Sequence, residues 1–527
     1  MQFRGTELEI DNIRDLLLER ANLGDKPLLI CGTEILTFGD ADERSNRVAQ
    51  SLTGLGIGQG DVVATFMYNS VDHVVIWLAC AKLGAVWASL NVSLASKELC
   101  YMISDTGAKL VVIDNEVLDI YLKIRVEVQP GLIEIIWGSL SSESYGFLPF
   151  ETLLDGRNVL PDVDIAPSDP MAIIYTSGST SMPKGVLVPH LYYLGAALRY
   201  QEITKTDPED VHFASSHLFH VGGQQFGLMC PLFCGITGVL TKWFSVTEYW
   251  KIVRETSATI IDPIGTMMTA LLTSEEQETD QNHSLRMGVG IATGQIRRSV
   301  RNRFEERFNV PLLEVYAMTE MGVLVCSERQ DDKRAGSCGR PHGWAEILIV
   351  DDKDAPVDAG EVGEILLRPT EQNCFMLEYI NKPKETVSSW RNLWYHTGDI
   401  GYLDEDGYLY FLGRQAHLIR HRGENVSSFE VEKALTEHPN VVDCGVVGVP
   451  GELGEEDIKV YVQVLPGSST TMEELAEWCV ERIATFKIPR YWEFVESFPR
   501  TITKHEISHH DLRRLGIGRS WDRVKRS

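Results

Sequence analysis

With 527 residues, the chain is too long for one hydrophobic core and is expected to form roughly three or four domains. Its 44% hydrophobic and 24% charged residues are ordinary for a globular protein and argue against long disordered regions. The formal charge of −26 at pH 7 opposes binding to nucleic acid or to anionic membrane surfaces, although a local positive site can still hold an anionic substrate.

Cysteine usage and apolar runs suggest a cellular location. The ten cysteines are scattered, and the close pair Cys230 and Cys234 lacks the second pair of a zinc site. The first residues lack the apolar core of a signal peptide, and Lys82 interrupts the longest apolar stretch, 74–88. We therefore expect reduced thiols, a cytoplasmic protein and no stable membrane association.

The first part of the chain alternates between helical and strand patterns. Apolar residues at helical spacing predict helices around 13–17, after Asp40 and at 72–83, and continuous apolar runs predict strands at 61–67, 109–114 and 133–137. A loop-like segment then runs to Pro170. This alternation predicts α/β layering.

A loop rich in hydroxyl groups and glycine follows the apolar residues 171–174, which read as a buried strand. Such a loop suits a polyphosphate, because glycine lets the backbone approach closely, hydroxyl and N–H groups bind phosphate oxygens, and a lysine adds positive charge. The residues concerned are Thr176, Ser177, Gly178, Ser179, Thr180 and Lys184. A Walker A loop is disfavoured, because Pro183 precedes the lysine and Gly185 follows it. A flexible surface loop is an equally good interpretation of this segment alone.

Further candidates lie beyond this loop. Residues 215–223 join a strand to an apolar helix, and there the glycines beside His220 would let a ligand approach the backbone; a helix-capping or core histidine is at least as plausible. Two buried strands are expected at 286–294 and 311–316. Because ligands bind outside the carboxyl ends of strands in open α/β sheets, Gly294 and residues 316–320 are candidates to converge on the loop after Tyr175.

After residue 330 the pattern changes. Short alternating strands at 345–350, 363–367 and 407–412 predict a small β-rich subdomain, in which residues 404–407 form a hairpin turn. A helix at 428–438, strands at 441–449 and 458–465 and a helix at 471–483 then predict a separate C-terminal domain of roughly 110 residues.

Four motifs in this order resemble those of the adenylate-forming enzymes, which include acyl-CoA synthetases, peptide-synthetase adenylation domains and firefly luciferases. They are residues 175–185, 316–320, 395–399 and 413–414. Residues 243–250 and 264–268 look most like the carnitine/crotonobetaine type of CoA ligase. The resemblance implies an α/β fold, with a large N-terminal domain (1–413) of two α/β subdomains and a small β-rich subdomain. A hinge at 414–416 and a small, mobile α+β C-terminal domain (417–527) would follow.

The resemblance also implies a two-step reaction. A carboxylate attacks the α-phosphate of Mg·ATP to give an acyl-adenylate and pyrophosphate, and a second nucleophile, commonly the thiol of CoA, displaces AMP. The cofactors would be ATP and Mg²⁺, with CoA as co-substrate. Because the protein contributes little covalent chemistry, positioning and charge neutralisation should dominate catalysis.

Residue roles carry over onto the matching positions. Residues 176–180 and Lys184 would hold the β- and γ-phosphates, Thr319 would bind the α-phosphate, and Glu320 would coordinate Mg²⁺. Tyr316 would stack against adenine, and Asp399 would bind the ribose hydroxyls with Arg414 nearby. His220, Val221, Gly222 and Gly223 match a segment that lines the acyl pocket. Taken singly, Tyr316 also reads as a core aromatic, Glu320 and Arg414 as surface charges, and Asp399 as a turn residue.

Two departures from the family pattern concern the switch between half-reactions. The hinge motif carries His417 where an acidic residue is usual. The C-terminal catalytic lysine motif reads 499–505 here, and a gapless match places His505 at the lysine position. Lys504 can take the role if the loop is one residue shorter, and we assign the adenylation step to Lys504 with His505 as the alternative.

The leading prediction is therefore an ATP-dependent ligase that joins a small-molecule acid to CoA. The departures motivate a second hypothesis, in which the acceptor is an amine or a carrier-protein thiol, including nitrite activation for diazotisation of an aromatic amine. A non-catalytic nucleotide-binding paralogue ranks last, because the nucleotide-binding residues are all present.

Overall fold

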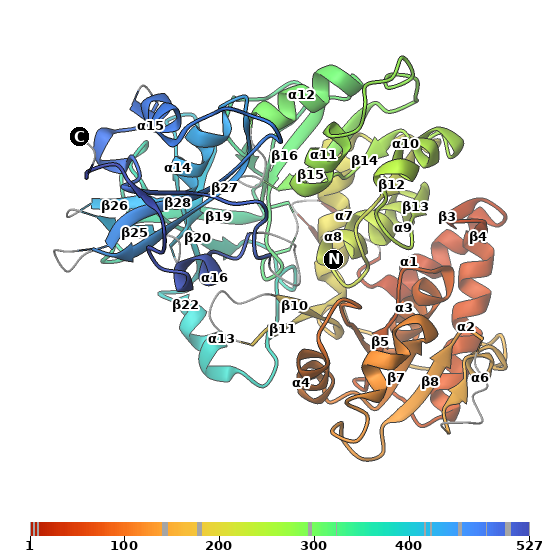
Figure 1. Ribbon diagram of the computed structural model, residues 1–527. Helices are drawn as coiled ribbons and strands as arrows, with labels where there is room; N and C mark the ends of the chain where they lie inside the picture. Colours follow the sequence, from red (N-terminus) through yellow and green to blue (C-terminus); the bar gives the residue numbers. More distant parts are fainter. Residues whose placement is uncertain are drawn as a thin grey trace.

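The computed structural model describes residues 2–3, 6–7, 10–139, 146–176, 182–292, 298–322, 324–415, 418–421, 424–451, 456–480, 482–500 and 507–525. Figure 1 shows the N-terminal sheets on one side of the molecule and the C-terminal elements, in blue, on the other. A short strand pair, β1 (Gln2–Phe3) and β2 (Thr6–Glu7), precedes them. None of the described helices is both long and apolar enough to cross a membrane.

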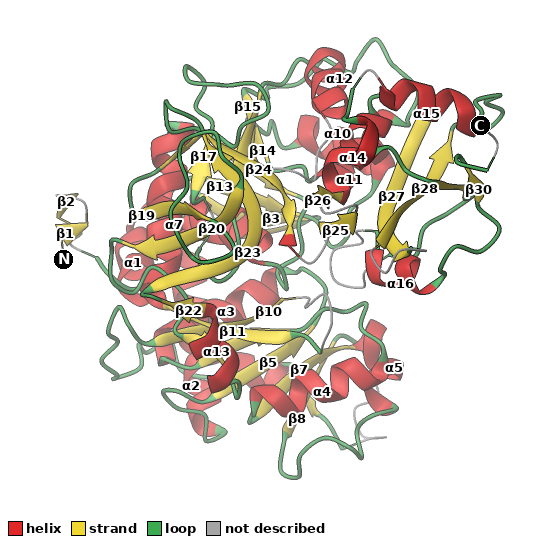
Figure 2. Cartoon of the chain, turned by 90° about the vertical axis from the view of Figure 1, so that its left-hand side faces the viewer, coloured by secondary structure: helices red, strands yellow, loops and turns green. Residues whose placement is uncertain are grey.

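The first large sheet is mostly parallel, in the order β21-β11-β10-β6-β5-β7-β8-β9. Its strands are β5 (Val62–Phe66), β6 (Val86–Ser89), β7 (Leu110–Asp114), β8 (Ile133–Trp137), β9 (Leu148–Pro149), β10 (Pro170–Thr176), β11 (Lys184–Pro189) and β21 (Glu378–Tyr379). Side chains alternate between its faces, so that Val63 and Val112 join one core, whereas Ala64 and Ile113 join another. The sheet is thus covered on both sides (Figure 2).

Helices cover the two faces of this sheet. Helices α2 (Phe38–Gly54) and α3 (Val71–Leu83) lie on one face, and α4 (Ser96–Thr106) and α5 (Leu118–Leu122) on the other. The segment expected to be loop-like up to Pro170 contains β9 and the short helix α6 (Glu151–Leu154). These elements are only two and four residues long, too short to give a readable pattern.

The second large sheet has the order β18-β17-β16-β15-β14-β12-β13-β3-β4. Its strands are β3 (Pro27–Cys31), β4 (Glu34–Thr37), β12 (Val211–Ala214), β13 (Thr237–Leu240), β14 (Ile260–Ile261), β15 (Met287–Ala292), β16 (Leu312–Tyr316), β17 (Cys326–Ser327) and β18 (Arg340–Pro341). Six neighbouring strands of this sheet, β16, β15, β14, β12, β13 and β3, run parallel, so their carboxyl ends share one edge.

One helix layer joins the two sheets. Helix α7 (His190–Thr204) shares a core with α3, where the rings of Trp77 and Tyr193 lie 5.5 Å apart. The same layer contains α1 (Ile13–Arg20), α8 (Val221–Gln224), the π-helix η4 (Gln225–Met229) and α9 (Cys230–Cys234). The outer face of the second sheet is covered by α10 (Val246–Glu255), α11 (Gly265–Leu272) and α12 (Arg298–Phe308).

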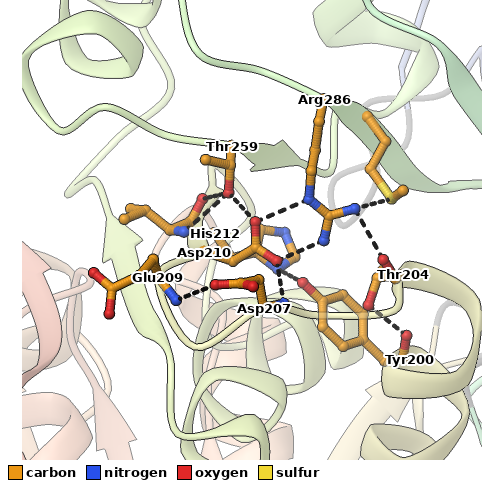
Figure 3. A network of polar contacts seen from close by, with 10 residues as sticks. Tyr200, Thr204, Asp207, Glu209, Asp210, His212, Thr259 and Arg286 are labelled. Carbon is orange, nitrogen blue, oxygen red and sulfur yellow. Dashed lines mark hydrogen bonds and ion pairs between the residues drawn. The ribbon is translucent and has the colours of Figure 1, made fainter.

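A polar network holds the amino ends of the second sheet (Figure 3). Asp210, just before β12, accepts hydrogen bonds from Arg286 (2.9 and 2.6 Å), just before β15, and from Thr259 (2.7 Å), just before β14. Burial alone would raise the pKa of Asp210, but the bonds from Arg286 and Thr259 outweigh it and leave this pKa below its usual value. The amino ends are thus fixed by side chains, and the opposite edge is left for a ligand.

The remaining strands form smaller sheets. The third contains β19 (Ala345–Val350), β20 (Gly363–Pro369), β22 (Trp390–Arg391), β23 (Trp394–Leu403) and β24 (Leu409–Arg414), with α13 (Pro383–Ser389) before β22. The expected turn joins β23 to β24, where Asp404 Oδ1 accepts hydrogen bonds from the N–H groups of Asp406 and Tyr408 (3.0 Å each).

The C-terminal part has its own core beneath the sheet β27-β28-β29-β30. Its elements are β25 (Leu418–His421), β26 (Glu424–Ser427), α14 (Ser428–Thr436), β27 (Val441–Pro450), β28 (Glu456–Val464), α15 (Met472–Val480), β29 (Tyr491–Phe494), α16 (His509–Arg514) and β30 (Trp521–Asp522). The predicted class, α/β with a large N-terminal and a small α+β C-terminal domain, is confirmed.

Candidate active site

Three predicted nucleotide-binding residues meet at the end of β16. The hydroxyl of Tyr316, the last residue of this strand, donates a hydrogen bond to Asp399 Oδ2 (2.7 Å), and Arg414 Nε lies 3.1 Å from Asp399 Oδ1. Asp399 and Arg414 are direct partners in the β23–β24 ladder. Asp399 is 3% exposed and lies within β23, so its interpretation as a turn residue is wrong.

The hydroxyl of Tyr316 is hydrogen-bonded to the carboxylate of Asp399. Burial, followed by the charge of Asp399, raises the pKa of Tyr316 well above its usual value, and the phenol therefore stays protonated as a donor. Its ring lies 6.1 Å from that of Phe411 on β24. The stacking of adenine against Tyr316 stays a prediction.

A second group surrounds Glu320. The hydroxyl of Tyr379 donates to Glu320 Oε1 (2.9 Å), and the ammonium of Lys184 lies 4.7 Å from the centre of the Tyr379 ring. The reason is topological, because β21 pairs with β11 and places Tyr379 opposite Val186, two residues from Lys184. The sequence analysis missed Tyr379, since a two-residue strand carries no local signal.

Tyr395 connects the two groups. Its hydroxyl lies 2.9 Å from that of Tyr379, and it belongs to β23, the strand that carries Asp399. Burial and then the charge of Glu320 raise the pKa of both tyrosines, and the charge of Arg414 acts on both in the opposite direction. The predicted residues from all four motifs thus form one continuous polar site.

Threonines at two predicted positions frame this site. Thr176 ends β10 and pairs with Lys184 across the hairpin to β11, so the two mark the ends of the predicted phosphate loop. The carbonyl oxygen of Thr319 accepts a hydrogen bond from the hydroxyl of Tyr192 on α7 (2.8 Å), which anchors the backbone between Tyr316 and Glu320.

The predicted acyl-pocket segment begins helix α8. His220 is the N-cap residue, and its side chain makes no capping hydrogen bond. With Tyr175, Phe219 and neighbouring residues it lines a cavity of about 10 Å³. Val221 and Gly222 start the helix, and a Cβ on Gly223 would lie 2.2 Å from the carbonyl oxygen of His217, so this close approach requires glycine.

Several predicted residues lie outside the described residues. They are Ser177, Gly178, Ser179, Thr180, Gly294, Ala416, His417, Lys504 and His505. Their roles, and the proposed hinge at 414–416, stay predictions.

The described side chains fit a metal-bound nucleotide. Lys184 offers a cation for phosphate, Glu320 a carboxylate oxygen of the kind that Mg²⁺ prefers, and Asp399 an acceptor for hydroxyl groups. The site thus combines carboxylate, hydroxyl and cationic groups, as the sequence motifs imply for a nucleotide-binding site.

Comparison with known proteins agrees with this geometry. Residues 19–379 match the AMP-binding enzyme family and residues 430–504 its C-terminal domain. The chain is 32% identical to a crotonobetaine/carnitine–CoA ligase of Salmonella arizonae over 492 residues, which cover 90% of this chain and 94% of the relative. The ligase of the same name from Escherichia coli O8 is 31% identical over 491 residues, with the same coverage.

Solved structures show the same likeness. An anthranilate CoA ligase in complex with anthranoyl-AMP superposes with a TM-score of 0.89 at 27% identity and covers 98% of both chains. The O-succinylbenzoate CoA synthetase of Bacillus subtilis, in complex with ATP and magnesium ion, has a TM-score of 0.81 at 26% identity and covers 94% of this chain and 98% of its own. The chain therefore belongs to the AMP-binding, adenylate-forming enzymes and is an ATP-using, AMP-forming ligase of the acyl-CoA synthetase type.

Proposed function

We propose that this ligase activates a small carboxylic acid as an acyl-adenylate, releases pyrophosphate and transfers the acyl group to CoA. The observation that carries the proposal is the continuous site in which Lys184, Glu320 and Asp399 meet around Tyr379 and Tyr395. The comparisons support it, since the relatives' names describe CoA ligases of small acids.

The predicted nucleotide-binding residues would divide the work of holding ATP. Lys184, with the threonine and serine residues of 176–180, neutralises the β- and γ-phosphates, and Thr319 binds the α-phosphate. Asp399, held between Tyr316 and Arg414, accepts hydrogen bonds from the ribose hydroxyls. Mg²⁺, when bound, would offset phosphate charge, and Glu320 would hold it.

The acid would enter beside α8. His220 and residues 221–223 line the acyl pocket, and they follow the carboxyl end of β12. The carboxylate would then attack the α-phosphate, which Thr319 would bind. Little covalent work falls to the protein, so the rate depends on holding both reactants in line and neutralising phosphate charge.

Pyrophosphate release from Mg·ATP tests this proposal. We would assay a panel of aliphatic acids, aromatic acids and nitrite, with and without CoA and candidate amines, and identify the products by mass. Acid-dependent release with an acyl-CoA product is expected. Release that ignores CoA but requires an amine or a carrier-protein thiol would move the enzyme to the second hypothesis, and no release with any acid would leave a nucleotide-binding paralogue.

The C-terminal motif is tested in the same assay. We propose that Lys504 carries the adenylation step, so Lys504→Ala should abolish most acid-dependent pyrophosphate release, whereas His505→Ala should retain it. The reverse pattern would assign the role to His505. Transfer from a separately prepared acyl-adenylate to CoA is a control, because a residue specific to the first step leaves it unchanged.

A further inference from the structure

The layer beside the predicted acyl pocket contains a buried amide group that has no hydrogen-bond partner in the described part of the chain. Gln225 is 0% exposed, and neither its Nε2 nor its Oε1 has a hydrogen-bond partner among the described residues. Exchanging the assigned positions of the two atoms changes nothing, since both lack partners. Leaving both ends of a buried amide unsatisfied is costly, and such a group therefore needs an explanation.

The preceding residue, Gln224, is a buried amide with a hydrogen-bond partner at each end. Gln224 Nε2 donates to the carbonyl oxygen of Leu218 (2.8 Å), and its Oε1 accepts from the hydroxyl of Tyr193 (2.5 Å). The side chain of Gln224 thus links α8 to α7. The side chain of the next residue, Gln225, has no hydrogen-bond partner among the described residues. Gln225 also opens the π-helix η4, and such π-helical turns are frequent at functional sites.

A buried carboxyl group lies in the same region. Asp262 follows the carboxyl end of β14, is 2% exposed and accepts a hydrogen bond from the N–H of Ser215 (3.3 Å), directly after the neighbouring strand β12. Burial raises its pKa well above the usual value. Besides burial, a negative charge on Asp262 would raise the pKa of the Cys230 thiol. The N–H of Cys230 donates a hydrogen bond to the carbonyl oxygen of Gln225 and so closes the π-helical turn.

Residues 215–218, which follow β12, lie between Asp262 and the helix that begins the predicted acyl pocket, and Gln225 follows the predicted pocket residue Gly223 by two positions. Ser216 Oγ lies 3.9 Å from the Cβ position of Gly222 in α8. Asn69, after β5 of the first sheet, holds this segment by donating to the carbonyl of Ser216 (3.2 Å) and accepting from the N–H of Leu218 (2.9 Å). The segment thus lies where the carboxyl ends of both sheets face each other, the usual place of a ligand crevice.

We infer that Gln225 and Asp262 form the polar inner end of the acyl pocket and select an acid whose far end carries a hydrogen-bonding substituent, such as an amino or hydroxyl group. This rests on the proposed function. An apolar acid would leave the amide unpaired, whereas a polar substituent would satisfy it, and a site built for hydrogen bonding rejects substrates that lack the group.

Matched acid pairs test this inference. Pyrophosphate release would be measured with 2-, 3- and 4-aminobenzoate against the corresponding methylbenzoates, and with 4-hydroxybutanoate against pentanoate. The wild type should prefer the polar member of at least one pair in kcat/KM by about tenfold or more. Gln225→Leu and Asp262→Asn should each cut that preference by about tenfold, mainly through the polar acid.

Thermal stability distinguishes selection from a structural role. Gln225→Leu removes an unsatisfied buried amide at nearly constant shape and should raise the Tm of the protein without acid. The matched control Gln224→Leu strands the hydroxyl of Tyr193 and should lower the Tm and slow both acids of a pair alike. If Gln225→Leu loses selectivity while its Tm is unchanged or raised, the loss is not a result of unfolding.

The outcomes separate this inference from the proposed function. If acids support pyrophosphate release but the methyl members are preferred throughout, or if Gln225→Leu slows both members equally, the polar pocket is refuted and the ligase reaction stands. If no acid of any kind supports release, the proposed function fails, and the inference is overturned with it.

Discussion

Tyr379→Phe removes one hydroxyl group from the centre of the proposed nucleotide site. Tyr379 donates its one hydroxyl proton to Glu320, so Tyr395 in turn donates to Tyr379. The phenylalanine ring keeps the cation contact with Lys184. The substitution therefore isolates the hydroxyl that fixes Glu320.

The expected effect follows from the strength of that bond. A hydrogen bond to a charged group contributes about 1.5–3 kcal/mol, which corresponds to a loss of roughly 10- to 150-fold in kcat/KM for ATP. We expect a higher KM for ATP and a higher Mg²⁺ requirement, because an unanchored Glu320 would hold the metal less firmly. Tyr379 acts here as a positioning residue.

Tyr395→Phe is the matched control. It removes the outer hydroxyl of the same chain and leaves the bond between Tyr379 and Glu320 intact. Steady-state pyrophosphate release at varied ATP and Mg²⁺, with thermal unfolding of both variants, would compare them. Both should lose stability, but Tyr395→Phe should change the ATP and Mg²⁺ dependence by less than about threefold. Equal kinetic losses in the two variants would refute this reasoning.

Three further predictions concern other charged or titrating groups. Asp399→Asn weakens the acceptor held by Arg414 and should raise the Kd for AMP by about tenfold or more in calorimetry, since a neutral amide is a poorer acceptor; an unchanged Kd would remove Asp399 from the site. Asp210→Asn strands Arg286 and should lower the free energy of unfolding by about 2–4 kcal/mol in denaturant titration, with no change in the KM for ATP; a loss under about 0.5 kcal/mol would contradict the structural role of this network. Burial lowers the pKa of His212 to about 3, below its usual value, so its stabilising contribution is present above about pH 6.5 and is lost as the pH falls. The loss should reach about 2 kcal/mol at pH 5, and His212→Phe should flatten the dependence of Tm on pH between 6.5 and 5; an equal slope in both proteins would contradict this.

Local patterns were sufficient for most of the elements. The strands expected at 133–137 and 345–350 match β8 and β19, and the hairpin turn at 404–407 lies between β23 and β24. Here periodicity and turn chemistry, which act over a few residues, determine the structure.

Long-range pairing decided what local patterns could not reveal. Tyr379 reaches Lys184 only because a two-residue strand joins the edge of a sheet whose other strands lie far earlier in the chain. Gln224 and Gln225 are neighbouring residues of the same type, yet both ends of the Gln224 amide are hydrogen-bonded, whereas neither end of the Gln225 amide has a partner among the residues that the structure describes. The order of the motifs in the sequence alone was sufficient to predict the fold class and the family. The side-chain contacts around Glu320 and the acyl pocket were decided by the tertiary structure, because packing and burial depend on which distant segments meet.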